Sequence, residues 1–227
     1  MWKSQHWTQT LEHEGEPVLS LSQALPSLSQ ALPLPVEERR PDRRMEQYYR
    51  HLGELWKNRW AAVLYPRACA ALQEARAGSR PFLPWEAELV YHVTLECDGL
   101  SSLYVDVTER QNGTRPLTVR TAETWELRSG TPKTLSEFFP PRLFWKKPII
   151  EALQRQALDR LQGGESLLFE DVETRVASYF SAKRFYLTEE GLSLFYPMWS
   201  LGSPAEGIPV FLLPLPTSLQ KLSPEKS

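Results

Sequence analysis

The sequence predicts an α+β fold in which a long N-terminal helix is followed by a mostly antiparallel sheet with one crossing helix. Two observations favour this class: apolar residues follow helical spacing after Met45, and apolar and polar residues alternate with a period of two from residue 86 onward. The chain has 227 residues, of which 41% are hydrophobic and 24% are charged. These values are typical of a globular protein, and the length suits one domain with tails.

The net charge of -2 at pH 7 argues against a protein whose main task is to coat nucleic acid or an anionic membrane, because those tasks need a basic excess. The first residues lack the basic start and apolar run of a secretory signal, and no segment is apolar enough to span a bilayer. We therefore expect a cytoplasmic protein by default. Its two cysteines, Cys69 and Cys97, are expected to be buried thiols, with a single disulfide as the alternative.

Residues 1–44 are predicted to form a tail that contains one strand, at an edge, over residues 17–22, and a proline-rich linker. The heptapeptide SLSQALP occurs twice in succession between residues 20 and 33, which is too few copies for a solenoid. We interpret the second copy as a local duplication that lengthens the following loop. The segment PLPVEERRPDRR then leads into the helix.

Residues 45–85 are predicted to form the helical N-terminal part of the domain. Five apolar residues three or four positions apart share one helix face: Tyr49, Leu52, Trp56, Trp60 and Val63. Pro66 lacks an amide donor and should kink or restart the helix, which gives a second piece over residues 67–76. Gly78 is the predicted stop signal.

Residues 86–216 are predicted to form the α+β domain itself, and residues 217–227 a C-terminal tail. Alternation over residues 89–95 and 103–107 predicts two strands, and Asn112-Gly113, a strong hairpin signal, precedes a third. Three strands joined by such short turns form a meander. Pro148 is well placed to start the crossing helix, which should end at the glycine pair 163–164.

The sequence carries no motif for catalysis, metal binding or cofactor binding. The four histidines lack metal-ligand spacing, and neither a glycine-rich phosphate loop nor a serine nucleophile elbow is present. Glu189 and Glu190, in a predicted hairpin turn, are the carboxylates that could still act in glycoside hydrolysis. We therefore predict a protein that is not an enzyme and that needs no cofactor and no metal.

The C-terminal stretch FYLTEEGLSLFYPMWSLGSPAEGIPVFLLP, residues 185–214, carries a long and specific pattern. It resembles the C-terminal signature of the RsiV-type domain family, a domain of unknown function found in lysozyme-sensing anti-sigma factors and in some peptidoglycan deacetylases. The matching residues are Phe185, Tyr186, Leu187, Thr188, Gly191, Leu192, Gly207, Ile208, Pro209, Phe211 and Pro214. The resemblance continues more loosely over residues 86–215.

This resemblance implies a non-enzymatic binding module of the bacterial cell envelope, whose partner is a protein such as lysozyme or a cell-wall glycan. In the relatives, the domain lies outside the cell membrane. The loop over residues 198–207 should touch the partner, because binding residues gather in loops held on a rigid sheet. The candidate binding residues are Trp199, Ser203, Pro204 and Glu206.

Two alternatives to a binding module remain open. One is a peptidoglycan-active enzyme that uses Glu189 or Glu190 as acid or base. The other is a cytoplasmic regulator or scaffold that has kept the fold.

Overall fold

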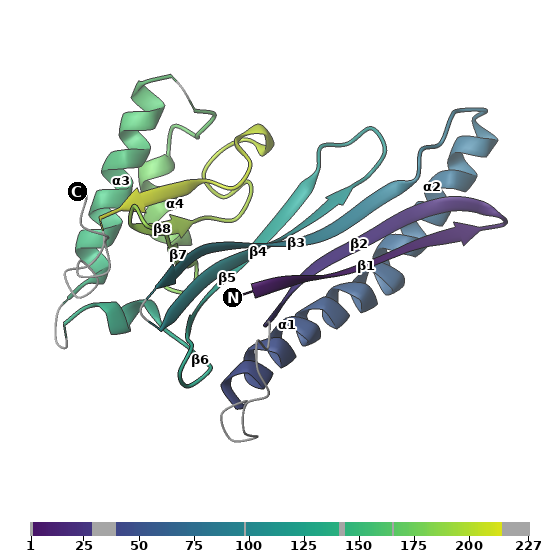
Figure 1. Cartoon of the computed structure of the whole chain (residues 1–227). Helices are drawn as coiled ribbons and strands as arrows, with labels where there is room; N and C mark the ends of the chain where they lie inside the picture. The colour runs from purple at the N-terminus through teal and green to yellow at the C-terminus, as the bar shows by residue number, and fades with distance from the viewer. Residues whose placement is uncertain (1, 29–39, 98, 141–143, 165, 215–227) are drawn as a thin grey trace. The chain divides into compact units, whose positions relative to one another are not determined.

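The computed structural model describes residues 2–28, 40–97, 99–140, 144–164 and 166–214. These residues form a six-stranded sheet of order β1-β2-β3-β4-β5-β6, a three-stranded sheet of order β7-β8-β9, and several helices (Figure 1). The α+β class is therefore confirmed, although the larger sheet is mixed, because β2 and β3 run parallel. The chain divides into two compact units, Met1–Tyr91 with Val105–Thr118 and His92–Tyr104 with Val119–Ser227.

The first unit begins with a long antiparallel hairpin of β1 (Trp2–His13) and β2 (Glu16–Leu28). Glu14 and Gly15, both with positive φ, make the tight turn between the two strands. The sequence predicts only one strand in this region, at residues 17–22, and places it at a sheet edge. The predicted edge position is wrong, because β1 occupies the edge of the sheet and β2 lies between β1 and β3. Most side chains of β1 are exposed on both of its faces, so its sequence shows no alternation to reveal it.

The strands β3 (Trp85–Cys97), β4 (Leu100–Arg110) and β5 (Leu117–Glu126) are consecutive neighbours in the sheet, as the predicted meander requires. Because β2 and β3 are parallel, the chain between them must cross over, and the long helix makes that crossover. Cys69 lies on this helix and Cys97 ends β3; both are half-buried thiols. Most of the proline-rich linker lies outside the described residues.

The long helix forms as predicted, but it follows the hairpin instead of opening the fold. It consists of α1 (Arg40–Arg59), a π-helical turn (Trp60–Leu64) and α2 (Tyr65–Ala77), and it ends at Gly78. This wide turn ends two residues before Pro66, where an ordinary helix would lose a hydrogen bond and clash with the preceding turn. A π turn holds more residues than an α turn, so the buried face shifts from Val63, which is 41% exposed, to Leu64.

The long helix approaches β2 closely at a glycine. The buried Gln23 donates a hydrogen bond of 2.8 Å from Nε2 to the carbonyl oxygen of Gly53 on α1. A Cβ atom at Gly53 would lie 2.7 Å from Cδ1 of Leu25 and 3.0 Å from Oε1 of Gln23, so a larger residue would require these two side chains to shift. On the same helix, Lys57 lies over the ring of Trp7 from β1, 4.2 Å from its centroid.

The second unit contains the elements predicted for the C-terminal half of the chain. The helices are α3 (Lys146–Gln162) and α4 (Val172–Tyr179), with short 3₁₀ turns at Leu135–Phe138 and Pro204–Glu206. The strands are β6 (Thr131–Pro132), β7 (Phe185–Leu187), β8 (Leu192–Phe195) and β9 (Val210–Leu213). The predicted hairpin over Thr188–Gly191 is therefore confirmed as the antiparallel pair β7–β8.

The helix α3 packs on the three-stranded sheet through both apolar and polar contacts. Its Ile149, Leu153 and Ala157 are buried in a core shared with β7, β8 and β9. Gln156 and Arg160 each donate a side-chain hydrogen bond of 2.8 Å to a main-chain carbonyl of β9, at Leu212 and Val210. The basic side chain of Arg160 thus serves the packing of α3.

The outer edge of β7 is closed by hydroxyl groups from the larger sheet. Thr94 donates a hydrogen bond of 2.6 Å from Oγ1 to the carbonyl oxygen of Leu187, and the amide of Leu187 donates one of 2.8 Å to Oγ of Ser102. Ser102 is fully buried and also shares a hydrogen bond of 2.8 Å with the hydroxyl of Thr124. Both main-chain groups of Leu187 are therefore satisfied by side chains.

We expect Ser102→Ala to lower the free energy of unfolding by about 1–3 kcal/mol, because it leaves the buried amide of Leu187 without its acceptor. Urea denaturation followed by tryptophan fluorescence measures the change. The control Ser4→Ala removes an exposed serine of β1 and should change stability by less than about 0.5 kcal/mol. Equal stability of the two variants would show that the hydroxyl does not hold β7.

Candidate functional site

The candidate site is the loop that joins β8 to β9 and carries the four residues predicted from sequence. Its middle forms a short antiparallel pairing with residues 167–169. The amide of Phe169 donates to the carbonyl oxygen of Leu201 at 2.9 Å, and the amide of Ser203 donates to that of Leu167, also at 2.9 Å. The loop is therefore anchored by main-chain hydrogen bonds near its centre as well as by strands at both ends.

Gly202 makes this pairing possible. It forms an isolated β-bridge with Leu168, and a Cβ atom at Gly202 would lie 2.6 Å from the carbonyl oxygen of Leu167. The neighbouring Leu201 is fully buried in the core of the second unit. No side chain larger than hydrogen fits at residue 202 without moving the main chain, so the loop has little freedom to shift.

Glu206 and Ser203 hold the loop in place. The carboxylate of Glu206 accepts a hydrogen bond of 2.6 Å from the amide of Leu167, and the carbonyl oxygen of Ser203 accepts one of 3.0 Å from the amide of Glu206. Pro204 is exposed and begins the 3₁₀ turn. Of the four predicted residues, these three therefore shape the loop, and only Trp199 presents a large side chain to solvent.

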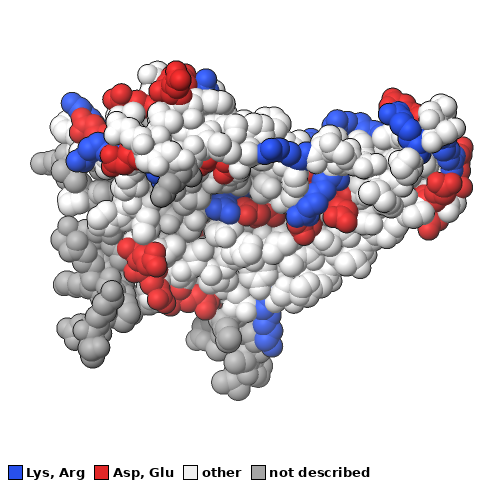
Figure 2. Space-filling view, turned by 90° about the horizontal axis from the view of Figure 1, so that it is seen from above, with Lys and Arg blue, Asp and Glu red and all other residues white. Residues whose placement is uncertain are grey.

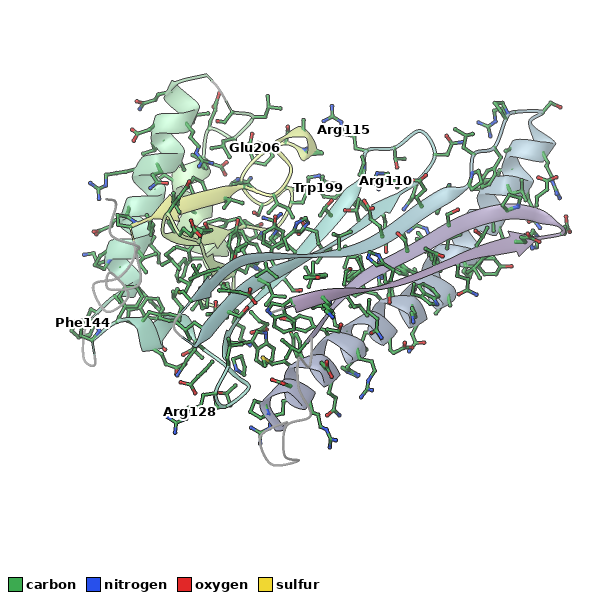
Figure 3. All side chains as sticks on the ribbon, in the orientation of Figure 1. Arg110, Arg115, Arg128, Phe144, Trp199 and Glu206 are labelled. Atoms are coloured by element: carbon green, nitrogen blue, oxygen red, sulfur yellow. The ribbon has the colours of Figure 1, made fainter. Side chains whose placement is uncertain are left out.

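Trp199 has an unusual main-chain conformation. Its φ angle is +71°, in the left-handed region that bulky residues rarely adopt, and its side chain is 49% exposed (Figure 3). Such a conformation costs about 1–3 kcal/mol, and residues held in it cluster at active sites, ligand clamps and switch regions. The second unit therefore presents a strained and half-exposed tryptophan on an anchored loop.

Arg175 supports the loop from α4 and was not predicted from sequence. Its guanidinium lies 4.6 Å from the ring centroid of Phe169 and donates a weak hydrogen bond of 3.4 Å to the carbonyl oxygen of Ser200. A hydrogen bond of 2.6 Å to Arg175 lowers the pKa of Asp171 below its usual range. The spacing of Asp171 and Arg175, four apart on one helix face, was the available signal in the sequence.

The carboxylates of the enzyme alternative do not form a buried site. Glu189 and Glu190 are both exposed in the β7–β8 turn, whereas a catalytic acid usually depends on a desolvated environment to raise its pKa. Within the described ranges, no group of three or more His, Cys, Asp or Glu side chains is arranged to hold a metal ion. No helix among the described residues has the length and apolar content needed to cross a membrane.

A second candidate surface lies in the first unit, where a groove of about 440 Å³ crosses β1, β2 and β3. The strand registers place its side chains in two rows, Thr10–Ser20–Glu86 and Thr8–Ser22–Glu88. Arg110 closes one end, 2.7 Å from Glu88 and 4.0 Å from Glu86. Acidic and basic side chains are interspersed on the face shown in Figure 2, so no single sign of charge dominates there.

The strain at Trp199 can be measured by comparing two substitutions that both remove the indole. We expect Trp199→Gly to be more stable than Trp199→Ala by about 1 kcal/mol, because glycine adopts positive φ without steric cost. Thermal and urea unfolding of the two variants measure this difference. If alanine proved as stable as glycine, the loop would not hold residue 199 in the left-handed region.

The fold is similar to that of two solved structures. One is a member of the DUF3298 family from Bacteroides fragilis NCTC 9343, with a TM-score of 0.60 and 14% identity over 94% of this chain and 90% of that chain. The other is a DUF3298 family protein from Pseudomonas aeruginosa PAO1, with a TM-score of 0.56 and 13% identity over 99% of this chain and 94% of that chain. No protein-family model and no curated protein matches the sequence. At these identities the likeness shows the fold alone, which is that of a domain family of uncharacterised function.

Proposed function

We propose that the chain is a non-enzymatic binding module and that the loop over residues 198–207 contacts a protein partner, with lysozyme as the first candidate. The observation that carries this proposal is Trp199, which is held half-exposed at positive φ in an otherwise anchored loop. Evolution rarely tolerates strain at an exposed aromatic residue unless a function depends on the geometry.

The surroundings of Trp199 fit a protein interface. Tryptophan and arginine are enriched among the residues that dominate binding energy, and Arg175 lies beside the loop. Leu167, on the segment paired with the loop, is 53% exposed and adds apolar area. A pre-organised loop also loses little conformational entropy when it binds, which favours affinity.

The choice of lysozyme rests on the resemblance of residues 185–214 to RsiV-type domains. The fold shared with two DUF3298 proteins is compatible with that resemblance and does not itself identify a partner. The exposure of Glu189 and Glu190 speaks against the peptidoglycan-active enzyme. Cell fractionation distinguishes the remaining alternative, a cytoplasmic regulator or scaffold, because a cell-wall role requires the protein outside the membrane.

We expect the protein to bind lysozyme and to inhibit its muramidase activity, and Trp199→Ala to weaken binding at least tenfold, since an interface aromatic commonly contributes more than about 1.4 kcal/mol. Isothermal titration calorimetry measures the affinity, and a turbidity assay measures inhibition in parallel. The matched control is Leu55→Ala, which removes an exposed apolar side chain from α1 in the first unit.

A second pair of variants separates contact from loop shape. Glu206→Gln keeps an oxygen acceptor for the amide of Leu167, whereas Glu206→Ala removes it. If Glu206 acts by holding the loop, only the alanine variant should weaken binding. An affinity for an identified partner that stays unchanged in Trp199→Ala would show that the loop is not the contact surface.

The groove of the first unit supports a second candidate function, the binding of a glycan. Its two rows of hydroxyl and carboxylate groups lie in register across three strands and offer repeated hydrogen-bonding positions. Neighbouring strands are about 4.8 Å apart, and same-face residues along a strand are about 6.5–7 Å apart, so the rows form a regular polar grid. A glycan, which has hydroxyl groups along its whole length, can form many hydrogen bonds with such a grid, each of them weak.

For this candidate we expect a soluble tetramer of β-1,4-linked N-acetylglucosamine to bind with low affinity, and Glu88→Ala to weaken binding at least fivefold, through loss of the carboxylate that Arg110 orients. Chemical-shift perturbation or calorimetry measures the affinity. Glu190→Gln, which changes an exposed carboxylate of the second unit, is the control and should have no effect. Equal binding by both variants would exclude the groove as the glycan site.

A further inference from the structure

The turn between β4 and β5 contains Asn112-Gly113, the hairpin signal of the sequence. The amide of Thr114 donates a hydrogen bond of 3.1 Å to the carbonyl oxygen of Gln111, and Gly113 has a φ angle of +72°. Positive φ at the third residue of a four-residue turn is the pattern of a type II turn, which suits glycine. The closing hydrogen bond of this turn uses the amide of Thr114, so it does not use the amide of Gly113.

The side chain of Asn112 and the amide nitrogen of Gly113 are both unrestrained. Both residues are exposed, and among the described residues neither group has a hydrogen-bond partner. Beyond its chain neighbours, a Cβ atom at Gly113 would meet no heavy atom within 4 Å, so the space around this glycine is open. The two groups can therefore approach each other through small rotations of the turn.

An asparagine side chain next to an accessible glycine amide can react within the chain. The deprotonated nitrogen of Gly113 attacks Cγ of Asn112, and the new C–N bond closes a five-membered succinimide ring. The side-chain NH₂ group leaves with the proton of the Gly113 amide as ammonia. One water molecule then opens the ring at either carbonyl, which gives aspartate or isoaspartate. Glycine favours the attack because it has no side chain to hinder the approach.

Arg115 adds a favourable charge beside this turn. Its side chain is exposed, and within the part of the chain that the structure describes it forms no ion pair (Figure 3). Arg110, at the other end of the turn, lies 2.7 Å from Glu88, and residues 111–115 include no acidic residue. A nearby positive charge stabilises both the anionic nitrogen and the oxyanion that forms at Cγ during the attack.

We propose that Asn112 is a site of spontaneous modification, converted through a succinimide with Gly113 into aspartate and isoaspartate. Water is the only co-reactant. In the isoaspartate form the main chain passes through Cβ, which adds one carbon to the turn and breaks the hydrogen bond between residues 111 and 114. The modification does not depend on the loop at Trp199 or on the glycan groove.

The other asparagine of the chain, Asn58, provides an internal comparison. It lies in α1, where the next amide belongs to the helical hydrogen-bond ladder and the next residue, Arg59, has a bulky side chain. We therefore expect Asn58 to stay unmodified under conditions that convert Asn112.

Peptide mapping by mass spectrometry tests the proposal on the full, folded chain after incubation in neutral to mildly basic buffer. We expect conversion at residue 112 at a rate within about tenfold of that in a synthetic peptide of residues 108–116, since loop tips open at little cost. The rate should rise about three- to tenfold for each pH unit, because the attack needs the deprotonated nitrogen. Conversion more than about tenfold slower than in the peptide would overturn the proposal.

Two variants assign the reaction to this turn. Asn112→Gln keeps the amide group but would require a six-membered ring, so it should remove the conversion at residue 112. Arg115→Glu should slow the conversion about two- to threefold at low ionic strength. An unchanged rate of ammonia release in Asn112→Gln would place the reaction at another residue and overturn the proposal.

Thermal unfolding of the products tests the effect on the turn. The isoaspartate form, separated by anion-exchange chromatography, should melt at a lower temperature than the unmodified protein. Asn112→Asp should melt close to the wild type, because aspartate also suits turns. Equal melting temperatures of the isoaspartate form and the unmodified protein would overturn the proposed loss of the turn.

Discussion

The second unit depends on how the main chain of Leu187 is satisfied. One side of β7 pairs with β8, and on the other side the amide and carbonyl of Leu187 meet the hydroxyls of Ser102 and Thr94. An unpaired main-chain group in that buried position would cost about 1–3 kcal/mol, so these hydroxyls fix where β7 can lie. Through β7 they also fix β8 and β9, and thereby the two ends of the loop that carries Trp199.

Attachments at the opposite edge of this sheet explain why the loop is rigid. β9 is held from the other side by the side chains of Gln156 and Arg160, which bond its carbonyls from α3. The loop between β8 and β9 is then bound at its middle to residues 167–169, where Gly202 permits close contact. Strain at Trp199 can persist because these separate attachments determine the path of the chain around it.

The parts of the fold in which apolar residues recur with a clear helical or strand period could be predicted from sequence. The strands β3, β4 and β5, the helix α3 and the β7–β8 hairpin carry a clear period or clear turn signals, although β7 and β8 are buried on both faces. The strand β1 was missed because an edge strand exposed on both faces carries no alternation. The sequence does not predict that Leu64 is buried instead of Val63. The π-helical turn near Pro66 changes which residues of the helix face the core.

Some properties of the candidate site can be predicted from its residue types, whereas others depend on the geometry of the folded chain. The sequence located the loop and its tryptophan, since turn residues and aromatics between two strands are visible in a single chain. It could not distinguish Glu206, which bonds the amide of Leu167, from a residue that contacts a partner, because both uses need only a carboxylate. The positive φ of Trp199 likewise comes from long-range attachments that local sequence does not encode.

The conformation of Trp199 is costly in the free protein, and contact with a partner would offset that cost. Its φ angle places strain next to a half-exposed ring, in a loop that is attached at both ends and at its middle. That residue 199 is a tryptophan and not a glycine is accounted for by the proposed use of its ring in binding.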